Sequence, residues 1–425
     1  MRRCTDISRL AGRLAGQLFL VALVFALHVT MPVGTKAQEA PSAEVVLRTS
    51  RIIDGNGGIL LRRDILVRDG RIAAIMPHGG RYDYDLRGMT VMPGWIDTHS
   101  HIAARVDSAG NYVLPGDLGA GETPQQAALA VAINGWKTLR AGFTTIQSPG
   151  DPLDGPLRDI VAESAFPVPR ILTSLGVIQA EHATTPAMAV AAIRRLKAEG
   201  ADFIKLFADG HGEMSQDVLA AACAEARGLG LRSVVHSQSL AATRRTIAAG
   251  CTTIEHGNSL DPGVLRAMKD AGMFLDPNLD VTVHYARRER DLPEAASYSH
   301  GDKKLMPPGY HQSVETFRMA LASGVQIAFG SDAVAGTHGE NADEFVWRVI
   351  DGGQSPMEAI TSATSVSASS IGLDDRIGRV ESGMIADLVA VEENPLNDIR
   401  KVKHVRFVMR GGIVHRFDPL AEEGI

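Results

Sequence analysis

The sequence predicts an α/β fold, a (β/α)8 TIM barrel with a small β-sandwich built from both chain ends. Short apolar segments alternate with helical stretches through the middle of the chain, which is the pattern of βα units around a parallel sheet. Short strands separated by glycine turns occur before and after that region. A length of 425 residues fits such a barrel with one small appended domain.

Strand-like runs with glycine turns occupy residues 44–90 and return only in residues 379–420. The region between them lacks this pattern of short strands and glycine turns. We therefore expect the two ends to pair into one composite β-sandwich domain beside the central domain. The runs that carry this prediction are Val45–Arg48, Asp64–Val67, Asp69–Ile75, Ala386–Val391 and Val405–Gly412.

Residues 91–378 predict the barrel, because they contain eight strand-like segments, which favour a closed barrel over an open doubly wound sheet. Thr185–Gly200 is one predicted intervening helix, with apolar residues at helical spacing and a terminal glycine. A Gly-rich phosphate loop does not follow the first strand, which argues against a nucleotide-binding sheet. The predicted strands are Val91–His101, Thr144–Ser148, Arg170–Leu175, Asp202–Phe207, Arg232–His236, Thr252–His256, Met273–Asn278 and Gln326–Asp332.

The N-terminus has the pattern of a signal peptide over residues 1–37. Four arginines between Arg2 and Arg13 precede the apolar run Leu18–Leu27, and a small-residue cleavage site lies near Thr35–Ala37. The apolar run is too short for a comfortable membrane span. The pattern therefore predicts an exported, periplasmic or secreted protein without a stable membrane anchor after cleavage, with an uncleaved N-terminal anchor as the alternative.

Composition and charge narrow the class of partner. With 45% hydrophobic residues, 22% charged residues and 43 glycines, the chain has the composition of a soluble globular protein. Its net charge of −6 does not predict a basic surface, so nucleic acid is not an expected partner, and a homo-oligomer is compatible with the sequence. Cys4 would leave with the signal peptide, and the spacing of Cys223 and Cys251 does not predict a metal site or a disulfide.

Metal-binding residue types stand at the ends of the predicted strands. The first strand ends in His99 and His101, whose spacing of two directs both imidazoles to one side. Later strands end in His236, His256 and Asp332. Because the C-terminal strand ends of a (β/α)8 barrel converge on one mouth, these residues together predict a metal site. Each one alone also fits a structural histidine or a helix-capping aspartate.

Lys205 is the unusual member of this set. It lies inside the apolar segment Asp202–Phe207, where a buried amine needs a specific reason. Burial lowers the pKa of a lysine and makes its amine nucleophilic, so the neutral amine can capture carbon dioxide and become a carbamate that bridges two metals. The alternative is an ion pair between Lys205 and a buried acid such as Asp332. The residues alone leave both interpretations open.

From about residue 44 onward the chain resembles the amidohydrolase superfamily. The specific resemblance is to the branch that contains Xaa-Pro dipeptidases, Xaa-Arg carboxypeptidases and ochratoxin-hydrolysing amidases, which share a composite domain with imidazolonepropionase-like hydrolases. The matching motifs are Pro93–His101, Phe203–Lys205, Ile254–Gly257, Gly330–Ala333 and the tail motif Gly378–Leu388.

The resemblance implies two divalent metal ions, with zinc expected, and a carboxylated lysine. It implies that the more buried ion is bound by His99, His101 and Asp332. It also implies that His236 and His256 bind the other ion and that Lys205 bridges the two. A bridging hydroxide would attack a polarised carbonyl, and Asp332 would pass its proton to the leaving amine. The implied reaction is hydrolysis of a C–N amide or peptide bond in dipeptide-like or N-acyl amino acid substrates.

Three loop histidines are candidate substrate-binding residues: His182, His211 and His338 follow the third, fourth and eighth predicted strands. Each can hydrogen-bond an oxyanion or a substrate carboxylate, or serve only as a loop cap. The segment after the seventh strand holds further polar residues, which we expect to form a solvated surface rather than a carboxylate clamp. They are Tyr285, Arg287, Arg288 and Arg290.

Three other functions remain open from the sequence. A one-metal deaminase or imidazolonepropionase-like hydrolase would share the histidines and Asp332, but such enzymes lack the lysine on the fourth strand. Lactone or ester hydrolysis on the same metals is a second alternative. A non-catalytic binding protein with this fold is a third, and the complete set of ligand residues argues against it.

Overall fold

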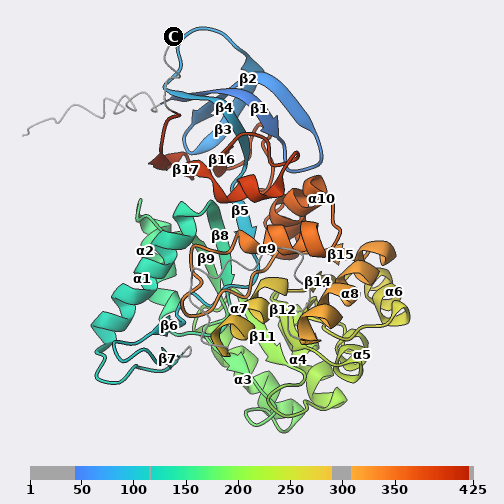
Figure 1. Ribbon diagram of the computed structural model, residues 1–425. Coiled ribbons are helices and arrows are strands. Elements are labelled where there is room, and N and C mark those ends of the chain that lie inside the picture. Colours follow the sequence, from blue (N-terminus) through green and yellow to red (C-terminus); the bar gives the residue numbers. More distant parts are fainter. Residues whose placement is uncertain (1–43, 114–115, 290–307, 421–425) are drawn as a thin grey trace, which may run out of the picture. The chain divides into compact units, whose positions relative to one another are not determined.

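The computed structural model describes residues 44–113, 116–289 and 308–420 (Figure 1). The predicted signal peptide, residues 1–37, lies outside these ranges, as do Arg290 and the side chains of Tyr285, Arg287 and Arg288. Within the described residues, none of the helices combines the length and the apolar character that a membrane span requires.

The central region forms a (β/α)8 TIM barrel, as predicted. Backbone hydrogen bonds close it between the first and last strands, where Thr98 N donates to Phe329 O at 2.8 Å and Asp332 N donates to His99 O at 2.7 Å. Its parallel strands are β5 (Trp95–Asp97), β8 (Phe143–Ser148), β9 (Arg170–Thr173), β11 (Phe203–Phe207), β12 (Arg232–Ser237), β13 (Thr253–His256), β14 (Phe274–Asp276) and β15 (Gln326–Ile327).

The ladder also continues between β9 and β11. Asp202 N, just before β11, donates to Thr173 O at 2.8 Å, and the short strand β10 (Val177–Ile178) pairs in parallel with β11. The sides of this barrel are therefore joined by backbone hydrogen bonds even where the regular strands are short. A closed barrel of this kind gathers the C-terminal strand ends at one mouth.

Helices connect the strands, and several begin at a side-chain cap. Thr185 caps α3 (Pro186–Ala198) by accepting a hydrogen bond from Met188 N, so the helix expected over Thr185–Gly200 is confirmed. The other helices between barrel strands are α1 (Pro124–Arg140), α2 (Asp154–Glu163), α4 (Gln216–Gly228), α5 (Leu240–Ala248), α6 (Pro262–Asp270), α7 (Leu279–Glu289) and α8 (Pro308–Ser323). After β15 follow α9 (Asp343–Val346), α10 (Pro356–Thr361), α11 (Ser367–Ser370) and the non-α helical turns Trp347–Asp351, Ser362–Val366 and Ile399–Lys403.

Both ends of the described chain contribute to one seven-stranded sheet with the order β18-β17-β16-β4-β1-β2-β3. Side chains from distant strands, including Val67, Ile72, Phe407 and Met409, pack into one buried cluster, so the sheet curls around its own core. The strands are β1 (Val45–Ile53), β2 (Ile59–Arg68), β3 (Arg71–Pro77), β4 (Tyr84–Pro93), β16 (Leu388–Glu392), β17 (Val405–Arg410) and β18 (Ile413–Phe417).

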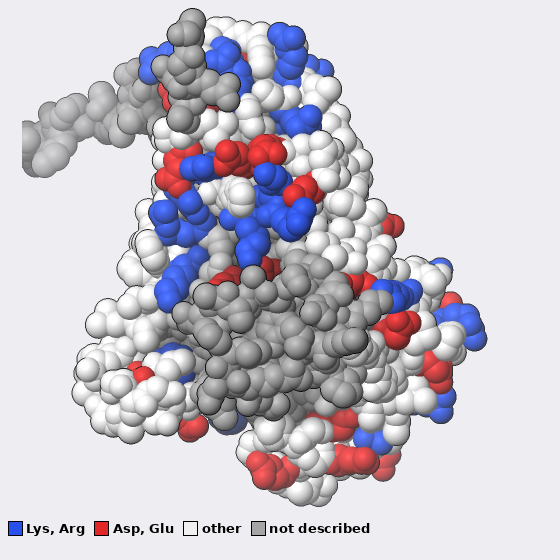
Figure 2. Space-filling view, viewed as in Figure 1, with Lys and Arg blue, Asp and Glu red and all other residues white. Residues whose placement is uncertain are grey.

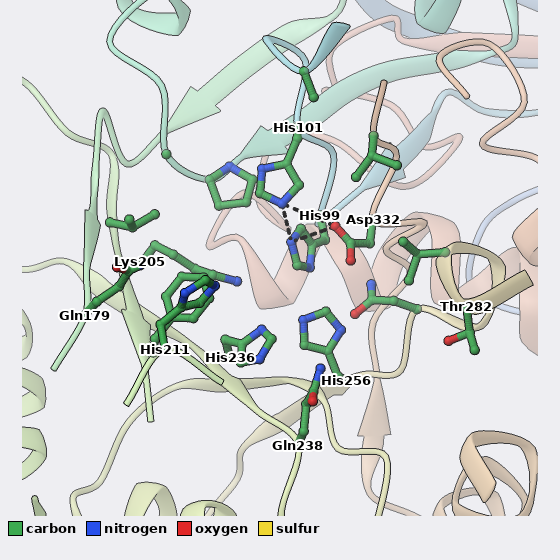
Figure 3. A pocket seen from close by; sticks show the side chains of 18 of the residues that line it. His99, His101, Gln179, Lys205, His211, His236, Gln238, His256, Thr282 and Asp332 are labelled. Carbon is green, nitrogen blue, oxygen red and sulfur yellow. Dashed lines mark hydrogen bonds and ion pairs between the residues drawn. The ribbon is translucent and has the colours of Figure 1, made fainter. Parts of the chain in front are cut away.

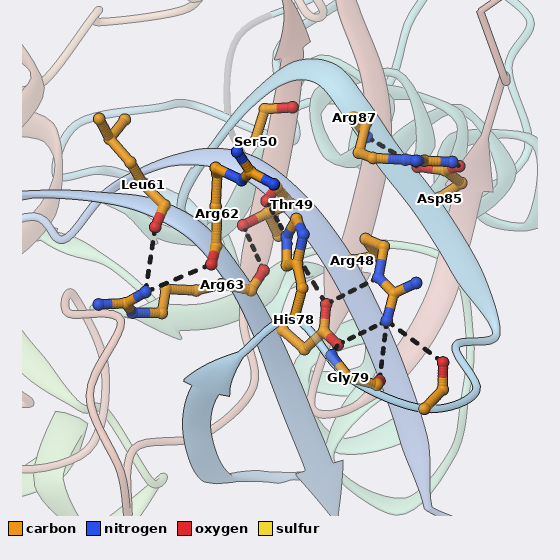
Figure 4. Close-up of polar contacts among 12 residues, drawn as sticks. Arg48, Thr49, Ser50, Leu61, Arg62, Arg63, His78, Gly79, Asp85 and Arg87 are labelled. Atoms are coloured by element: carbon orange, nitrogen blue, oxygen red, sulfur yellow. Dashed lines mark hydrogen bonds and ion pairs between the residues drawn. The ribbon is translucent and has the colours of Figure 1, made fainter.

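A buried carboxylate holds one side of this sheet. Asp64 is fully buried and accepts hydrogen bonds from Arg48 Nε at 3.1 Å and from Gly79 N at 3.1 Å. Figure 4 shows Arg48 and Gly79 beside His78, whose ring nitrogen lies 2.8 Å from Thr49 O. The guanidinium lowers the pKa of Asp64, although burial alone would raise it.

The first barrel strand is shorter than the sequence predicted. Val91–Pro93 belongs to β4, which pairs with β1 and β16 in the seven-stranded sheet, and the barrel strand starts at Trp95. Gly94 separates the two because a Cβ at this position would lie 2.2 Å from Thr144 Oγ1. A single apolar run therefore supplies strands to both parts of the protein.

The expectation that Cys223 and Cys251 remain unpaired was wrong. The two residues form a disulfide between α4 and the segment before β13, with Cα atoms 5.1 Å apart. A separation of 28 residues does not resemble a cysteine framework, and only the packing of α4 against its neighbours brings the thiols together.

On the face shown in Figure 2, basic side chains gather in the upper half of the molecule, with acidic side chains among them. Basic residues on and after the turn Ile399–Lys403 pair with acids, as in Lys401 with Glu393 at 2.6 Å and Arg406 with Glu392 at 2.7 Å. These ion pairs neutralise part of the basic surface.

Candidate metal centre

The predicted ligand residues all line one cavity at the C-terminal ends of the barrel strands. Figure 3 shows them pointing toward a common centre, with His99 and His101 opposite His236 and His256. The cavity has a volume of about 570 Å³. Barrel closure brings these side chains together although the chain separates the first from the last by more than half its length.

Three of these atoms form a near-equilateral triangle. His99 Nε2, His101 Nε2 and Asp332 Oδ1 are each 3.2 Å from the other two. Zinc–nitrogen and zinc–oxygen bonds of roughly 2.0–2.2 Å in tetrahedral geometry place neighbouring ligand atoms about 3.3–3.5 Å apart. The three atoms therefore fit three ligand positions around one divalent cation.

The second group surrounds Lys205, which is 1% exposed. The rings of His236 and His256 lie 4.5 Å apart, and His236 stacks on Phe207 at 4.6 Å. His236 Nε2 is buried without a hydrogen-bond partner among the described residues. A buried imidazole nitrogen without a hydrogen bond, beside a second histidine, is free to bind a metal ion.

Burial sets the charge of this cluster. It lowers the pKa of Lys205 from 10.5 to about 7, while Asp332 and Asp276 act in the opposite direction. Burial and the nearby Lys205 charge lower the pKa of His236 to about 3. The pKa values of His99 and His256 also lie well below the ordinary 6.5, chiefly through burial. His99, His236 and His256 are therefore neutral at physiological pH, which is the form that binds metal.

Asp97 connects the first and last barrel strands beneath the triangle. Its Oδ1 accepts hydrogen bonds from His99 N at 3.1 Å and Ser331 N at 3.0 Å. Its Oδ2 accepts from the Ser331 hydroxyl at 2.6 Å and from the Asn341 amide at 2.7 Å. Burial raises the pKa of Asp97 to about 7 despite these bonds. These bonds hold the backbone amide of His99 and that of Ser331, the residue before Asp332.

Two of the predicted ligand residues have an uncommon backbone conformation. His256 has a φ of 70° and Asp332 a φ of 53°, both in the left-handed region. Such conformations cost about 1–3 kcal/mol and persist where the surrounding structure enforces them, often at functional sites. Here they turn the two side chains toward the cavity at the point where each strand ends.

The remaining cavity wall combines neutral polar groups with apolar surface. In Figure 3, Gln179 lies beside Lys205 and His211, Gln238 lies below His256, and Thr282 lies on the opposite side of the cavity from Gln179. Amide and hydroxyl side chains of this type can donate to and accept from a peptide group. The sequence did not indicate these residues, which are Tyr112, Gln179, Gln238, Asn258, Asn278 and Thr282.

The three candidate substrate-binding histidines have different places. His211 lines the cavity and contacts the Phe207 ring at 5.1 Å. His182 is exposed beside Glu181 and lies outside the cavity lining. His338 is buried, and its Nε2 donates to Ala104 O at 3.0 Å, so it supports the cavity wall from behind. The structure brings only His211 of the three to the cavity.

Glu255 is a buried group that the sequence interpretation did not assign. It lies beside His256 on β13 and contacts both Lys205 and His99. The acid beside Lys205 is therefore Glu255 rather than the Asp332 proposed as its alternative partner. Its position in the motif Ile254–Gly257 was the available signal.

Known proteins share this fold and sequence pattern. The family model described as Amidohydrolase family matches residues 90–414. Ochratoxinase of Aspergillus niger is 26% identical over 422 residues, covering 86% of this chain and 85% of that protein. Imidazolonepropionase of Salinispora arenicola is 24% identical over 374 residues, covering 80% of this chain and 88% of that protein.

A solved structure extends the comparison. A Xaa-Pro dipeptidase with bound methionine in its active site superimposes with a TM-score of 0.77 at 26% identity, covering 88% of this chain and 100% of that one. The region that the family model matches, residues 90–414, includes every predicted ligand residue, from His99 to Asp332. The chain is a hydrolase that belongs to the amidohydrolase family.

Proposed function

We propose that the protein hydrolyses a C–N amide or peptide bond in dipeptide-like or N-acyl amino acid substrates at a two-metal site. The observation that carries the proposal is Lys205, a buried lysine among strand-end histidines at the barrel mouth. Burial lowers the pKa of this amine to about 7, and the uncharged amine that burial favours is the form that carbon dioxide carboxylates.

The donor set suits two divalent cations, for which zinc is the expected metal. The first would be held by His99, His101 and Asp332, whose ligand atoms form the triangle described above. The second would be held by His236 and His256, with carboxylated Lys205 between the two. Imidazole nitrogen and carboxylate oxygen are the ligand types that such cations accept.

When bound, the cations would activate water and polarise the scissile carbonyl. Asp332 is 9% exposed and lines the cavity, so its carboxylate can reach the attacking water. We assign it the transfer of that proton to the leaving nitrogen. His211 and the neutral amide groups on the wall would bind the peptide group of the substrate through hydrogen bonds.

The similarity to two named hydrolases supports an amide substrate. An ochratoxinase and a Xaa-Pro dipeptidase are similar to this chain at 26% identity each over more than four-fifths of its length. The imidazolonepropionase is a more distant relative. Lys205 favours the two-metal amidase over the one-metal alternative, because the one-metal enzymes lack this lysine.

An exported location is part of the proposal. Residues 1–37 have the signal-peptide pattern, and the Cys223–Cys251 disulfide is a bond that persists in oxidising compartments. Small peptides and N-acyl amino acids in the periplasm or outside the cell are then the accessible substrates.

A substrate panel with matched variants tests the proposal. Purified protein is assayed on Xaa-Pro and Xaa-Arg dipeptides, N-acyl amino acids, and ester and lactone analogues, beside Lys205→Ala. We expect amide hydrolysis by the wild type that chelators abolish, and loss of roughly 100-fold or more in Lys205→Ala, because the bridging group is removed. Chelator-resistant activity, full activity of Lys205→Ala, or hydrolysis of the esters and lactones alone would each refute the proposal.

A further inference from the structure

Glu255 is a carboxylate with no exposed surface inside the ligand cluster. Its oxygens make no hydrogen bond among the described residues, and the contacts they do make are ion pairs with His99 and Lys205. A buried carboxylate without hydrogen bonds is unfavourable unless a cation or a bound group compensates for it. The position of Glu255 therefore calls for a positively charged neighbour.

Its neighbours are two of the proposed ligands. Glu255 Oε1 lies 3.3 Å from His99 Nδ1, and Oε2 contacts Lys205 Nζ. With His99 and His256, Glu255 also forms a group whose ligand-type atoms all lie within 4.8 Å of one another. One side chain thus reaches both halves of the metal centre.

The contact with His99 bears on which ring nitrogen can bind a metal. A carboxylate beside Nδ1 favours the proton on that nitrogen and leaves the lone pair on Nε2. His99 Nε2 is the atom that faces His101 and Asp332 at 3.2 Å. Glu255 therefore stands on the far side of the ring from the proposed cation.

The contact with Lys205 bears on charge. Two divalent cations bring four positive charges into a buried site, and buried charge without compensation is strongly unfavourable. Asp332 and a carboxylated Lys205 would supply two negative charges, and ionised Glu255 supplies a third. Once Lys205 carries a carbamate, its ammonium no longer neutralises Glu255, so the cations must do so.

We infer that Glu255 is a positioning residue of the metal centre, which orients His99 and supplies a negative charge needed to retain both cations. This inference rests on the two-metal site of the proposed function. It adds to that site a buried carboxylate that contacts His99 and Lys205.

The test is the zinc affinity of Glu255→Gln, which keeps the size of the side chain and removes its charge. Competition with a chromophoric chelator should show binding roughly 10- to 100-fold weaker than in the wild type. Asp64→Asn is the matched control, because it removes another fully buried, ion-paired carboxylate, in the seven-stranded sheet. Its zinc affinity should equal that of the wild type.

The outcomes separate the two claims. Wild-type zinc affinity in Glu255→Gln overturns the inference about Glu255 and leaves the proposed function standing. A wild type that does not bind two ions overturns the proposed function. Should Glu255→Gln fail to fold, nitrogen NMR of histidine-labelled, zinc-loaded wild type decides, because the inference requires His99 to carry its proton on Nδ1. A proton on Nε2 would overturn it.

Discussion

His211 and His338 both follow barrel strands, but their surroundings predict different effects of substitution. His211 lines the cavity, so His211→Ala should lower kcat/KM by about 3- to 10-fold, the value of one hydrogen bond to substrate, without changing stability. His338 donates to Ala104 O from a buried position, so His338→Ala should lower the free energy of unfolding by about 1–3 kcal/mol.

Steady-state kinetics and urea unfolding of the two variants check this pair of predictions. His182→Ala serves as a control, because His182 is exposed and lies outside the cavity lining. A large loss of stability in His211→Ala, or none in His338→Ala, would contradict the assigned surroundings.

The buried carboxyl group of Asp154 should make the stability of the protein depend on pH. Burial, and then the charge of Asp151, raise the pKa of Asp154 from 3.8 to about 8 in the folded protein. At a pH between 3.8 and about 8, Asp154 keeps a proton in the folded state that it has lost in the unfolded state. The free energy of unfolding therefore falls as the pH rises toward about 8. Asp154→Asn removes this contribution of up to about 1.4 kcal/mol per pH unit.

Urea unfolding of wild type and Asp154→Asn between about pH 5 and about pH 9 measures the difference. The variant should gain stability relative to the wild type as pH rises. Parallel stability curves for the two proteins would show that Asp154 is ionised in both the folded and the unfolded state.

Residue identities were easier to predict than the directions of their side chains. The strand-end histidines were recognisable because period two and strand ends are visible in sequence. Glu255 was missed because strict alternation would direct it away from His256. The left-handed φ of His256 breaks that alternation, and φ is set by tertiary packing.

At the level of elements, removing the disulfide between α4 and the segment before β13 should lower the free energy of unfolding without lowering catalytic activity. Closing a loop across 28 residues is worth about 3–4 kcal/mol in the chain-entropy model. The double variant Cys223→Ala/Cys251→Ala should lose about this much free energy of unfolding and keep kcat/KM, because neither residue lines the cavity.

Urea unfolding, kinetics and thiol counting under denaturing conditions test this element. The wild type should show no free thiol at either position. Reactive Cys223 and Cys251 thiols in oxidised wild type, or unchanged stability of the double variant, would contradict the disulfide.

The sequence located the barrel strands better than it located their boundaries. Apolar runs followed by helical periods gave β8, β11, β12 and β13 nearly as observed. Val91–Pro93 was assigned to the barrel because its apolar run continues through Trp95, and hydrophobicity does not reveal a change of sheet. The change occurs at Gly94, where close packing against Thr144 excludes any side chain.

Across the whole molecule, the seven-stranded sheet and the barrel share one packed interface. Met92, Val389 and Val408 from the sheet lie in the same buried cluster as Trp95 and Phe329 from the barrel. β4 and β5 are consecutive in the chain, so the sheet anchors the strand that directly precedes His99 and His101. The composite domain thereby supports the site from the end opposite to the mouth.

Zinc titration of metal-free protein, with hydrolysis followed at each step, tests the two-metal claim most directly. We expect activity to rise until two equivalents per chain are bound, and Lys205→Ala to reach neither this stoichiometry nor the wild-type rate. Full activity at one equivalent, or two tightly bound ions and full activity in Lys205→Ala, would contradict it.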